Sequence, residues 1–184
     1  MISIIGAGPV GSYTADKLAK AGFKVDLFDQ KSIIGKPVQC TGLVSKNLLD
    51  FVKPNSDVIL NKIDGARIYA PNNSFLEVKK KNIALVLDRE NLDKQLFDQA
   101  LSSGAKAFLK QKLTKISKIK DSYNLQFNSK NVKTNILIGA DGPLSTVAKL
   151  SGMYKKRKLL YVLQVISKLK DKDENFVELH FGNN

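Results

Sequence analysis

The sequence predicts an α/β protein in which a parallel, Rossmann-like sheet carries a β-meander and is followed by the start of an antiparallel sheet. Three observations support this fold class. A glycine-rich turn, GAGPVG, joins a short apolar run to a helical pattern near the N-terminus. Short strand-like runs and turns, rather than repeated strand–helix units, fill the middle of the chain. A second apolar run, ILIGAD at residues 136–141, then ends in an Asp-Gly turn.

The first thirty residues predict a β-α-β unit. Residues 2–5 (ISII) have the length and composition of a buried strand, and residues 24–29 (KVDLFD) those of a second strand. A helix is expected between them, from about Pro9 to Ala21, because a parallel strand pair needs such a crossover. The residues at helical spacing along it are Val10, Tyr13, Thr14, Lys17, Leu18 and Ala21.

The glycine-rich turn of this unit carries the strongest functional signal. Gly6 permits a tight turn, Gly8 lets the backbone approach a pyrophosphate, and Gly11 lets the helix pack closely on the strand. The N-terminus of the helix adds unpaired N–H groups and a partial positive charge. Asp29 ends the second strand, where it can accept hydrogen bonds from ribose hydroxyls. The pattern predicts a dinucleotide site, and Asp29 disfavours a 2′-phosphate because two anions would face each other.

Residues 44–103 predict a mixed set of elements. A short helix is expected at 44–52, a hairpin around Asn72-Asn73, and a separate strand at 83–88. An amphipathic helix follows from Arg89 to about Ser103. Its shared apolar face is expected to consist of Leu92, Leu96, Phe97 and Leu101.

The remainder of the chain reads mainly as strands. We expect strand-like segments at 108–120, 123–128 and 132–141, a short helix at 143–150, and two strands at 159–170 and 175–182. The last two strands have no visible partner layer in the sequence. We therefore expect an N-terminal fragment that stops inside a second domain.

Two further motifs extend the nucleotide pattern. Asp141-Gly142 follows the last apolar run, with Ser145 three residues after the glycine, and Arg89 opens its helix within RENLD. With the glycine-rich turn, this arrangement resembles the glutathione-reductase-type FAD-binding fold in its hydroxylase-like branch. The resemblance implies that Asp141 approaches the ribityl and pyrophosphate region and that Arg89 reaches the flavin nucleotide, where its fork of donors suits phosphate. The arginine usual after the serine is replaced by Ala148, which argues against a typical aromatic hydroxylase.

Both motifs also have simpler explanations. Asp141-Gly142 is also what a plain turn after a buried strand would look like, and an arginine at a helix start is also common on a solvated surface. An arginine at this position opposes the dipole of its own helix, which favours a partner-driven explanation for Arg89.

The only cysteine stands in GKPVQCTGLVS, at residues 35–45. Together with GADGPLSTVAKLSG, this stretch is similar to the geranylgeranyl reductase family, whose members carry a G-x-P-V-x-C-x-G-like segment. The resemblance implies that Cys40 lies near flavin and substrate and helps to protonate the carbon that does not receive hydride. Thiols are mostly protonated at neutral pH and can donate a proton. The alternative is that Cys40 is a small buried hydrophobe without a chemical role.

The resemblance implies an FAD-dependent oxidoreductase that saturates isoprenoid C=C bonds, for example in archaeal ether-lipid precursors, by hydride transfer from reduced flavin. Its partners would be an isoprenoid or prenylated lipid substrate and an electron donor, either reduced ferredoxin or NAD(P)H. Two alternatives stay open: an FAD-dependent monooxygenase of the aromatic hydroxylase branch, and an inactive FAD-binding fragment. The expected catalytic residue is Cys40, and the expected cofactor-binding residues are Gly6, Gly8, Pro9, Val10, Gly11, Asp29, Gln30, Arg89, Asp141 and Gly142.

The domain organisation follows from the same resemblance. We expect residues 1–153 to form an FAD-binding domain and residues 154–184 to begin an incomplete substrate-binding domain. Residues 53–87 would contribute strands to the substrate domain. No metal site is expected, because the chain contains no cluster of Cys and His residues.

Thirty Lys and Arg against seventeen Asp and Glu give a net charge of +13. The densest basic runs, at 78–82 and 154–158, lack the interleaved aromatic residues of single-strand binders, so no nucleic-acid partner is expected. The lysines fit a solvated surface or a preference for anionic lipid. No run of eighteen apolar residues and no signal-peptide pattern occur, and one cysteine suits a reducing compartment. We expect a cytoplasmic protein, with peripheral association at a membrane surface left open.

Overall fold

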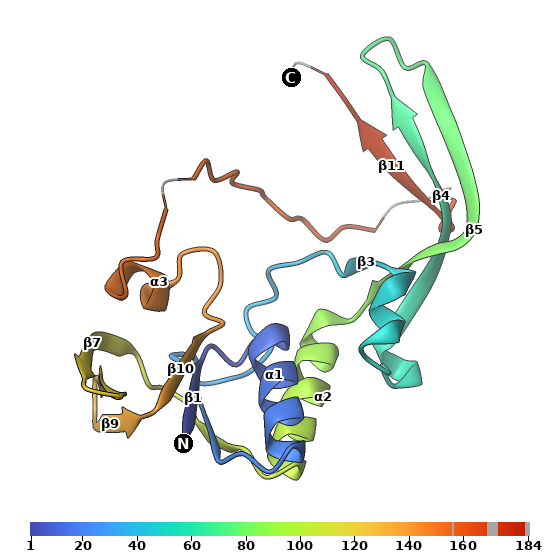
Figure 1. Cartoon of the computed structure of the whole chain (residues 1–184). Helices are drawn as coiled ribbons and strands as arrows, with labels where there is room; N and C mark the ends of the chain where they lie inside the picture. The colour runs from blue at the N-terminus through green and yellow to red at the C-terminus, as the bar shows by residue number, and fades with distance from the viewer. Residues whose placement is uncertain (156, 169–172, 183–184) are drawn as a thin grey trace. The chain divides into compact units, whose positions relative to one another are not determined.

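The fold is taken from a computed structural model that describes residues 1–155, 157–168 and 173–182. The chain divides into two compact units, each made of two segments (Figure 1). The first unit comprises Met1–Pro37 and Glu90–Tyr161, and the second comprises Val38–Arg89 and Val162–Asn184. No helix among the described residues is long and apolar enough to cross a bilayer.

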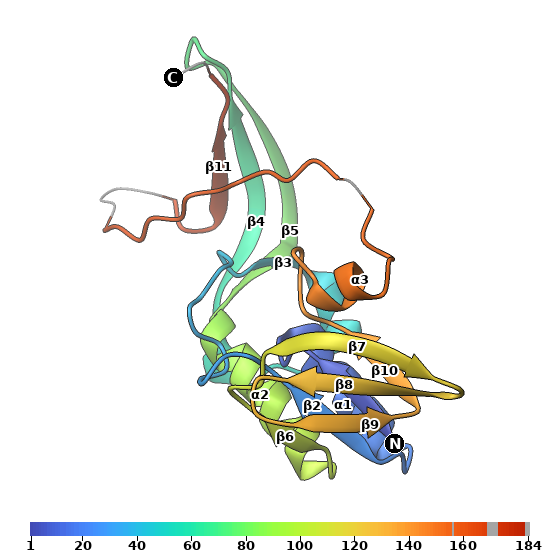
Figure 2. The ribbon, with the colours of Figure 1, turned by 90° about the vertical axis from the view of Figure 1, so that its left-hand side faces the viewer.

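The first unit is built on a four-stranded parallel sheet in the order β10-β1-β2-β6. Two helices cross over between its strands, a third follows β10, and a three-stranded antiparallel meander, β7-β8-β9, interrupts the sequence before β10 (Figure 2). The elements are β1 (Ile2–Ile5), α1 (Pro9–Lys20), β2 (Val25–Phe28), α2 (Arg89–Ser102), β6 (Lys106–Phe108), β7 (Leu113–Ile119), β8 (Ser122–Phe127), β9 (Asn131–Thr134), β10 (Ile136–Gly139) and α3 (Thr146–Leu150). The predicted α/β class with a parallel Rossmann-like sheet and further antiparallel sheets is confirmed.

The two faces of the parallel sheet have separate hydrophobic cores. Neighbouring residues alternate between them: Ile4 packs with the helices α1 and α2, whereas Ile5 packs with the meander and α3. On β2, Leu27 belongs to the core on the helix side of the sheet, and Phe28 belongs to the core on the meander side. Side chains at 0% exposure occur on both faces, so the sheet forms the middle of three layers.

A polar contact joins the two helices on the first face. The buried carboxylate of Asp16 on α1 accepts a hydrogen bond from the Ser103 hydroxyl, 2.6 Å away at the end of α2, and one from Lys20 at 3.0 Å. Burial raises the pKa of Asp16, but the hydrogen bonds from Lys20 and Ser103 and the charges of Lys20 and Lys17 outweigh it, so this pKa lies below its ordinary value. The charged form of Asp16 therefore stabilises the fold.

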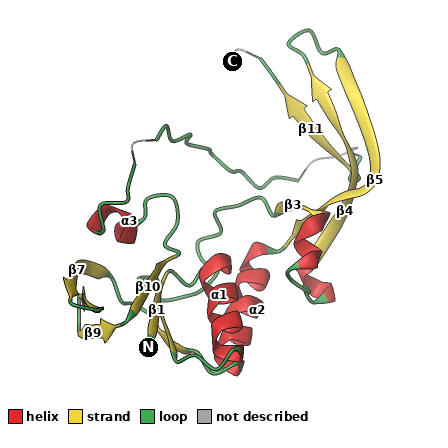
Figure 3. Cartoon of the chain, viewed as in Figure 1, coloured by secondary structure: helices red, strands yellow, loops and turns green. Residues whose placement is uncertain are grey.

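The second unit is a four-stranded sheet in the order β11-β4-β5-β3. The β4–β5 hairpin is antiparallel and long, β3 pairs antiparallel with β5, and β11 pairs in parallel with β4 (Figure 3). The elements are β3 (Leu43–Ser45), the 3-10 turns η1 (Lys46–Asp50) and η2 (Ser56–Val58), β4 (Ile59–Tyr69), β5 (Phe75–Leu87) and β11 (Phe176–His180). The hairpin turns at Asn73, whose φ of +62° is of the kind that asparagine tolerates, as the sequence predicted.

Several boundaries differ from the sequence expectations. The separate strand expected at 83–88 is the second half of β5, which continues through a bulge where Asn82 has a φ of +52°. The short helix expected at 44–52 is a 3-10 turn preceded by β3. The run at 132–141 breaks into β9 and β10, which belong to different sheets.

The face of α1 and the last apolar stretch also differ. Gly11, Ser12, Ala15 and Asp16 form the buried face of α1, whereas Val10 is 68% exposed. Small side chains occupy this face because the helix lies close to the sheet. On α2, Ala100 is buried and Leu101 is 38% exposed, so Leu101 does not belong to the predicted face.

Within the stretch predicted as a strand at 159–170, the described residues 159–168 form loop (Figure 3). Residues 169 and 170 lie outside the described residues. The second strand predicted in this region is present as β11.

Candidate nucleotide-binding site

The site is formed where three neighbouring parallel strands end together. Ile5 of β1 is paired with Phe28 of β2 on one side and with Gly139 of β10 on the other. The glycine-rich turn, Asp29 and Asp141 directly follow these three strands. Ligands of open α/β sheets bind at the carboxyl ends of the strands, so the topology brings the two sequence motifs to the expected edge.

Gly6 and Gly11 are required by close backbone approach. Gly6 has a φ of +102°, and a Cβ placed on it would lie 2.3 Å from the carbonyl oxygen of Ala140. A Cβ on Gly11 would lie 1.8 Å from the carbonyl oxygen of Gly6. The turn is therefore pressed between the start of α1 and the Asp-Gly segment, with no room for a side chain at either position.

Gly8 is different, because a Cβ on it would have no heavy atom within 4 Å. The space beside Gly8 is open while the chain on either side of it is tightly packed. Gly8 is also the N-cap of α1, with Pro9 in the first turn and no acidic residue there. The backbone N–H of Ser12 is hydrogen-bonded to the Gly8 carbonyl at 2.9 Å, so the N–H groups of Val10 and Gly11 precede the first intrahelical bond. N–H groups at the start of a helix favour negatively charged groups, so this position is the candidate place for a phosphate.

Asp29 holds the glycine-rich turn in place. Its Oδ2 accepts a hydrogen bond from the Ala7 N–H at 2.7 Å, and its Oδ1 accepts one from the Lys31 N–H at 2.8 Å. A carboxylate oxygen has two acceptor positions, so the ribose contact predicted for Asp29 is still available. The carboxylate thus has a structural role that the sequence argument did not include. Gln30, the next residue, is exposed.

Asp141 organises the segment that follows β10. One carboxylate oxygen accepts a hydrogen bond from the Ser145 hydroxyl, and the other accepts one from the Val147 N–H at 3.0 Å. Ser145 in turn caps α3 by accepting from the Ala148 N–H at 2.9 Å. Gly142 has a φ of +82° and open space at its Cβ position. Asp141 and Ser145 therefore shape the turn, while Gly142 leaves one side of it uncovered.

Arg89 and Cys40 belong to the second unit. Arg89 is half-buried and is the first residue of α2, as predicted. Cys40 is a free, half-buried thiol in the loop before β3. That loop is fixed at Gly42, which has a φ of +80° and whose carbonyl accepts a hydrogen bond from the Leu87 N–H at 3.0 Å.

Two contributors to the site were not predicted from the sequence. The hydroxyl of Ser12, a fully buried residue, lies 3.1 Å from the Ala7 carbonyl and ties α1 to the turn. Ala140 presses its backbone against Gly6. For Ser12, the only signal in the sequence was a serine among the small residues of α1. The contact of Ala140 with Gly6 involves its backbone, so it leaves no signal in the sequence. Among the described residues, no group of three or more His, Cys, Asp or Glu is placed to hold a metal ion.

Comparison with known proteins extends this geometry. The family described as NAD(P)-binding Rossmann-like domain matches residues 4–41, which contain the glycine-rich turn and Asp29. A digeranylgeranylglycerophospholipid reductase of Methanosphaera stadtmanae is 32% identical over 98% of this chain and 50% of its own length. An uncharacterized protein encoded in the nifH2 5′ region of Methanosarcina barkeri is 36% identical over 83% of this chain and 87% of its own length.

Solved structures show the same fold. A geranylgeranyl bacteriochlorophyll reductase-like protein of Thermoplasma acidophilum has a TM-score of 0.77 at 23% identity, over 98% of this chain and 50% of its own. The halogenase PltM, solved with phloroglucinol and FAD, has a TM-score of 0.67 at 20% identity, over 82% of this chain and 36% of its own. The chain spans about half the length of the reductases it matches. Over that half, it belongs to the geranylgeranyl reductase family.

Proposed function

We propose that the first unit binds FAD. The observation that carries the proposal is the open space at Gly8, enclosed by the tightly packed Gly6 and Gly11 and by the start of α1. A pyrophosphate fits this space, because it needs close backbone approach and N–H donors rather than side chains. Asp29 would accept from the adenosine ribose, and Asp141 and Gly142 would border the ribityl chain. Family membership favours FAD over a nicotinamide dinucleotide for the same space.

The cofactor is tested by releasing the ligand of the purified chain with heat and identifying it by mass. Flavin is expected, and a nicotinamide dinucleotide without flavin would overturn the proposal. Gly8→Val should leave the fold intact, because its Cβ meets nothing, but should abolish flavin binding. Gly182→Val is the matched control, since the Cβ of Gly182 also has open space and lies in the second unit. The control should bind flavin normally.

We further propose that the protein acts in saturating C=C bonds of isoprenoid lipids, the reaction class of its reductase relatives. Reduced FAD, when bound, supplies hydride for such a reaction. The chain would supply the nucleotide site and a proton, and the electrons would come from reduced ferredoxin or NAD(P)H. Saturation of a geranylgeranyl lipid without oxygen would support this assignment. Turnover only in the presence of oxygen would indicate a monooxygenase, and flavin binding without turnover in either condition would indicate an inactive FAD-binding fragment.

Arg89 is proposed to grip the flavin nucleotide. Its position at the start of α2 matches the family pattern, and loss of a charge-assisted hydrogen bond weakens affinity about ten- to a hundredfold. Arg89→Ala should therefore lower the affinity for FAD, measured by flavin fluorescence titration. Lys118→Ala, which removes an exposed positive charge from β7, is the control. Equal affinities in the two variants would contradict the role of Arg89.

Cys40 is proposed as the proton donor to the alkene carbon that does not receive hydride. The thiol would lose its proton to that carbon and regain one from solvent, so the hydride and the proton together saturate the bond. Cys40→Ser should keep flavin and fold but slow alkene saturation on the order of a hundredfold, without changing the rate of flavin reduction. If Cys40 only packs, Cys40→Ala should be active and Cys40→Ser should mainly lose stability, because partial burial of a hydroxyl in place of the thiol costs free energy.

We also propose that the protein works in the cytoplasm at the surface of an anionic membrane, where a lipid substrate resides. The net charge of +13 supports this location, because lysines near an anionic surface each contribute about 1 kcal/mol. Co-sedimentation with anionic vesicles that weakens as salt is raised would support it, and equal binding to neutral vesicles would contradict it.

A further inference from the structure

The positive charge of the chain is concentrated on the meander of the first unit. Residues 110–134 contain seven lysines and one acidic residue, Asp121, so they carry six of the thirteen net positive charges. Lys130 is half-buried, with its ammonium group 3.4 Å from the centroid of the Phe108 ring. The other six are exposed, and we call them the meander lysines: Lys110, Lys112, Lys115, Lys118, Lys120 and Lys133.

The meander has an apolar side and a polar side. Ile116, Leu125 and Val132 lie in one row across β7, β8 and β9 and pack into the core beneath the meander (Figure 2). Side chains alternate along a strand, so the rows before and after this one project away from the core. We call this side the outward side: Lys115, Ser117, Asn124, Gln126, Asn131 and Lys133.

The meander lysines have no acidic partner among the residues that the structure describes. The ion pairs of the described chain all lie elsewhere. On the helices of the first unit, Asp16 and Glu90 each pair with two lysines. The meander therefore presents its positive charge to solvent without neutralising it.

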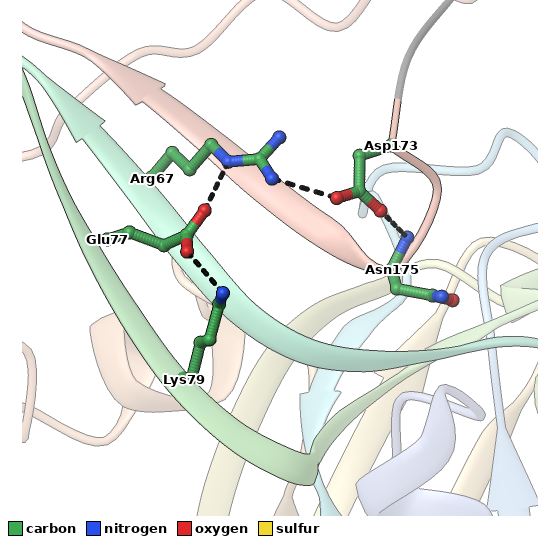
Figure 4. Close-up of polar contacts among 5 residues, drawn as sticks. All are labelled: Arg67, Glu77, Lys79, Asp173 and Asn175. Carbon is green, nitrogen blue, oxygen red and sulfur yellow. Dashed lines mark hydrogen bonds and ion pairs between the residues drawn. The ribbon is translucent and has the colours of Figure 1, made fainter.

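The sheet of the second unit shows the opposite arrangement. The Arg67 guanidinium donates to Glu77 at 2.7 Å and to Asp173 at 2.8 Å, and Lys79 lies 2.7 Å from the second oxygen of Glu77 (Figure 4). We call this side of β4 and β5 the charged face. Its basic groups are matched by acidic groups, so unpaired positive charge is a particular property of the meander.

The composition of the outward side indicates which kind of anionic partner it fits. Protein interfaces are enriched in arginine and aromatic residues and depleted in lysine, and single-stranded nucleic acid is bound on aromatic platforms. The outward side has neither arginine nor aromatic residues. Lysine is a compact charge on a flexible stem, which suits mobile anionic lipid head groups that impose no fixed geometry.

The turn between β7 and β8 adds an apolar group to this surface. Ile119 is 51% exposed at the end of β7, between Lys118 and Lys120. An apolar side chain flanked by lysines suits the boundary of a bilayer, because the lysine stems can lie along the apolar region while their charges remain among the head groups. A purely electrostatic partner would not require Ile119.

We propose that the outward side of the meander, with the β7–β8 turn, is the surface by which this protein binds an anionic lipid membrane. The inference rests on the membrane location proposed above, and it assigns to one surface what the net charge leaves to the whole chain. The alternative role of these lysines is to keep the edge strands β7 and β9 from pairing with other sheets.

The test is co-sedimentation of the purified chain with vesicles of phosphatidylglycerol and phosphatidylcholine in equal parts. Combining Lys115→Gln, Lys120→Gln and Lys133→Gln should weaken binding about a hundredfold, since each lysine near such a surface contributes about 1 kcal/mol. The matched control combines Lys46→Gln, Lys80→Gln and Lys81→Gln, which remove the same charge from exposed positions of the second unit. It should bind within about twofold of wild type, because charges more than a Debye length from the surface are screened.

A second variant tests the apolar contribution without changing the charge. Ile119→Ser should weaken vesicle binding at least about threefold, because less apolar surface enters the bilayer boundary. Unchanged binding of Ile119→Ser would contradict the part of the proposal that concerns the turn. Flavin content is measured in every variant, and an unchanged content shows that the first unit is folded.

The other outcomes separate this inference from the proposals on which it rests. Equal weakening in the lysine variant and its control would overturn the inference but leave the membrane location standing, whereas no binding by the wild-type chain would overturn both. Vesicle binding that the lysine variant retains while it self-associates in light scattering would assign the lysines to edge protection. Tighter binding of a random-sequence RNA than of vesicles at physiological salt would assign the surface to nucleic acid. Loss of flavin or of turnover in the wild-type chain would concern the proposed chemistry alone.

Discussion

The two units of the chain differ in how completely they bury their own apolar residues. In the first, each face of the parallel sheet is covered, by helices on one side and by the meander on the other, and side chains such as Ile4 and Phe28 are fully buried. In the second, the sheet of β11, β4, β5 and β3 contributes no residue to either core cluster. Among the described residues, the parallel sheet is thus covered on both faces by elements of its own unit, whereas the strands of the second sheet belong to neither cluster.

This difference has a physical origin. A parallel sheet is made with crossover connections, so its covering helices come from the same stretch of sequence. An antiparallel hairpin such as β4–β5 forms with a short turn and acquires no cover in doing so. Its second layer must come from elsewhere in the sequence or from another molecule.

The largest expected effect is on the stability of the first unit. It distinguishes Gly11, which the fold requires, from Gly8, which is proposed to be required for binding flavin. Gly11→Val should destabilise the chain by about 3 kcal/mol or more, because its Cβ would lie 1.8 Å from the Gly6 carbonyl oxygen. Gly8→Val should lose flavin, but it should unfold at the midpoint of the wild-type chain when both are free of flavin, since bound flavin itself raises the midpoint. Thermal unfolding of both variants checks this, and similar midpoints for the two would contradict the description of the turn.

The second prediction compares the units directly. Amide hydrogens of β1 and β2 should exchange at least about a hundredfold more slowly than those of β11, because the first two strands are covered on both faces and β11 is an edge strand. Exchange followed by mass spectrometry at peptide resolution makes the measurement. Equal protection of the two sheets in the isolated chain would remove the basis of the comparison.

The third prediction concerns the contact between α1 and α2. Asp16→Asn should lower stability at pH 7 by about 1.5–3 kcal/mol, the usual range for hydrogen bonds to charged groups. The pKa of Asp16 is lower in the folded protein than in the unfolded chain, so its contribution is present above about pH 4 and is lost as the pH falls through the folded value. Denaturant unfolding at pH 7 and at pH 3 should show a smaller difference between variant and wild type at pH 3. A constant difference would exclude the ionised carboxylate as the cause.

The smallest effect is expected on the charged face of the second unit. Hydrogen bonds from Lys79 and Arg67 lower the pKa of Glu77, and its side chain is 25% exposed, against 7% for that of Asp16. Glu77→Gln should therefore destabilise less than Asp16→Asn, and the loss should shrink in high salt because exposed ion pairs are screened. Unfolding at low and high ionic strength tests both statements. An effect larger than that of Asp16→Asn would show that the charged face contributes more to stability than its exposure suggests.

Local patterns explain why much of the site could be predicted. The glycine spacing, the strand on each side and the terminal Asp29 are consecutive features, and each has a direct steric or electrostatic meaning. The position of Arg89 at a helix start was equally local. The second role of Asp29, holding the Ala7 and Lys31 N–H groups, was not predictable, because it depends on how the turn folds back over the strand.

Errors arose where packing overrides the local pattern. The apolar spacing of α1 did not show that Gly11, Ser12 and Ala15 form its buried face, because close approach to a sheet selects small residues over large ones. The run at 132–141 reads as one strand, yet its two halves belong to different sheets. At this break the Thr134 hydroxyl lies 3.0 Å from the Met1 carbonyl oxygen.

The sequence by itself therefore determined the fold class, the nucleotide motif and the family, since these depend on residue types at short spacings. Only the tertiary structure decided that the glycine-rich turn meets the Asp-Gly segment, because that contact joins Gly6 and Ala140 across the sheet. It alone also revealed that Leu179, Ile68 and Leu76 lie in one row across three strands. Strand alternation was visible in the sequence, but the register that aligns β11, β4 and β5 is set by pairing between distant segments.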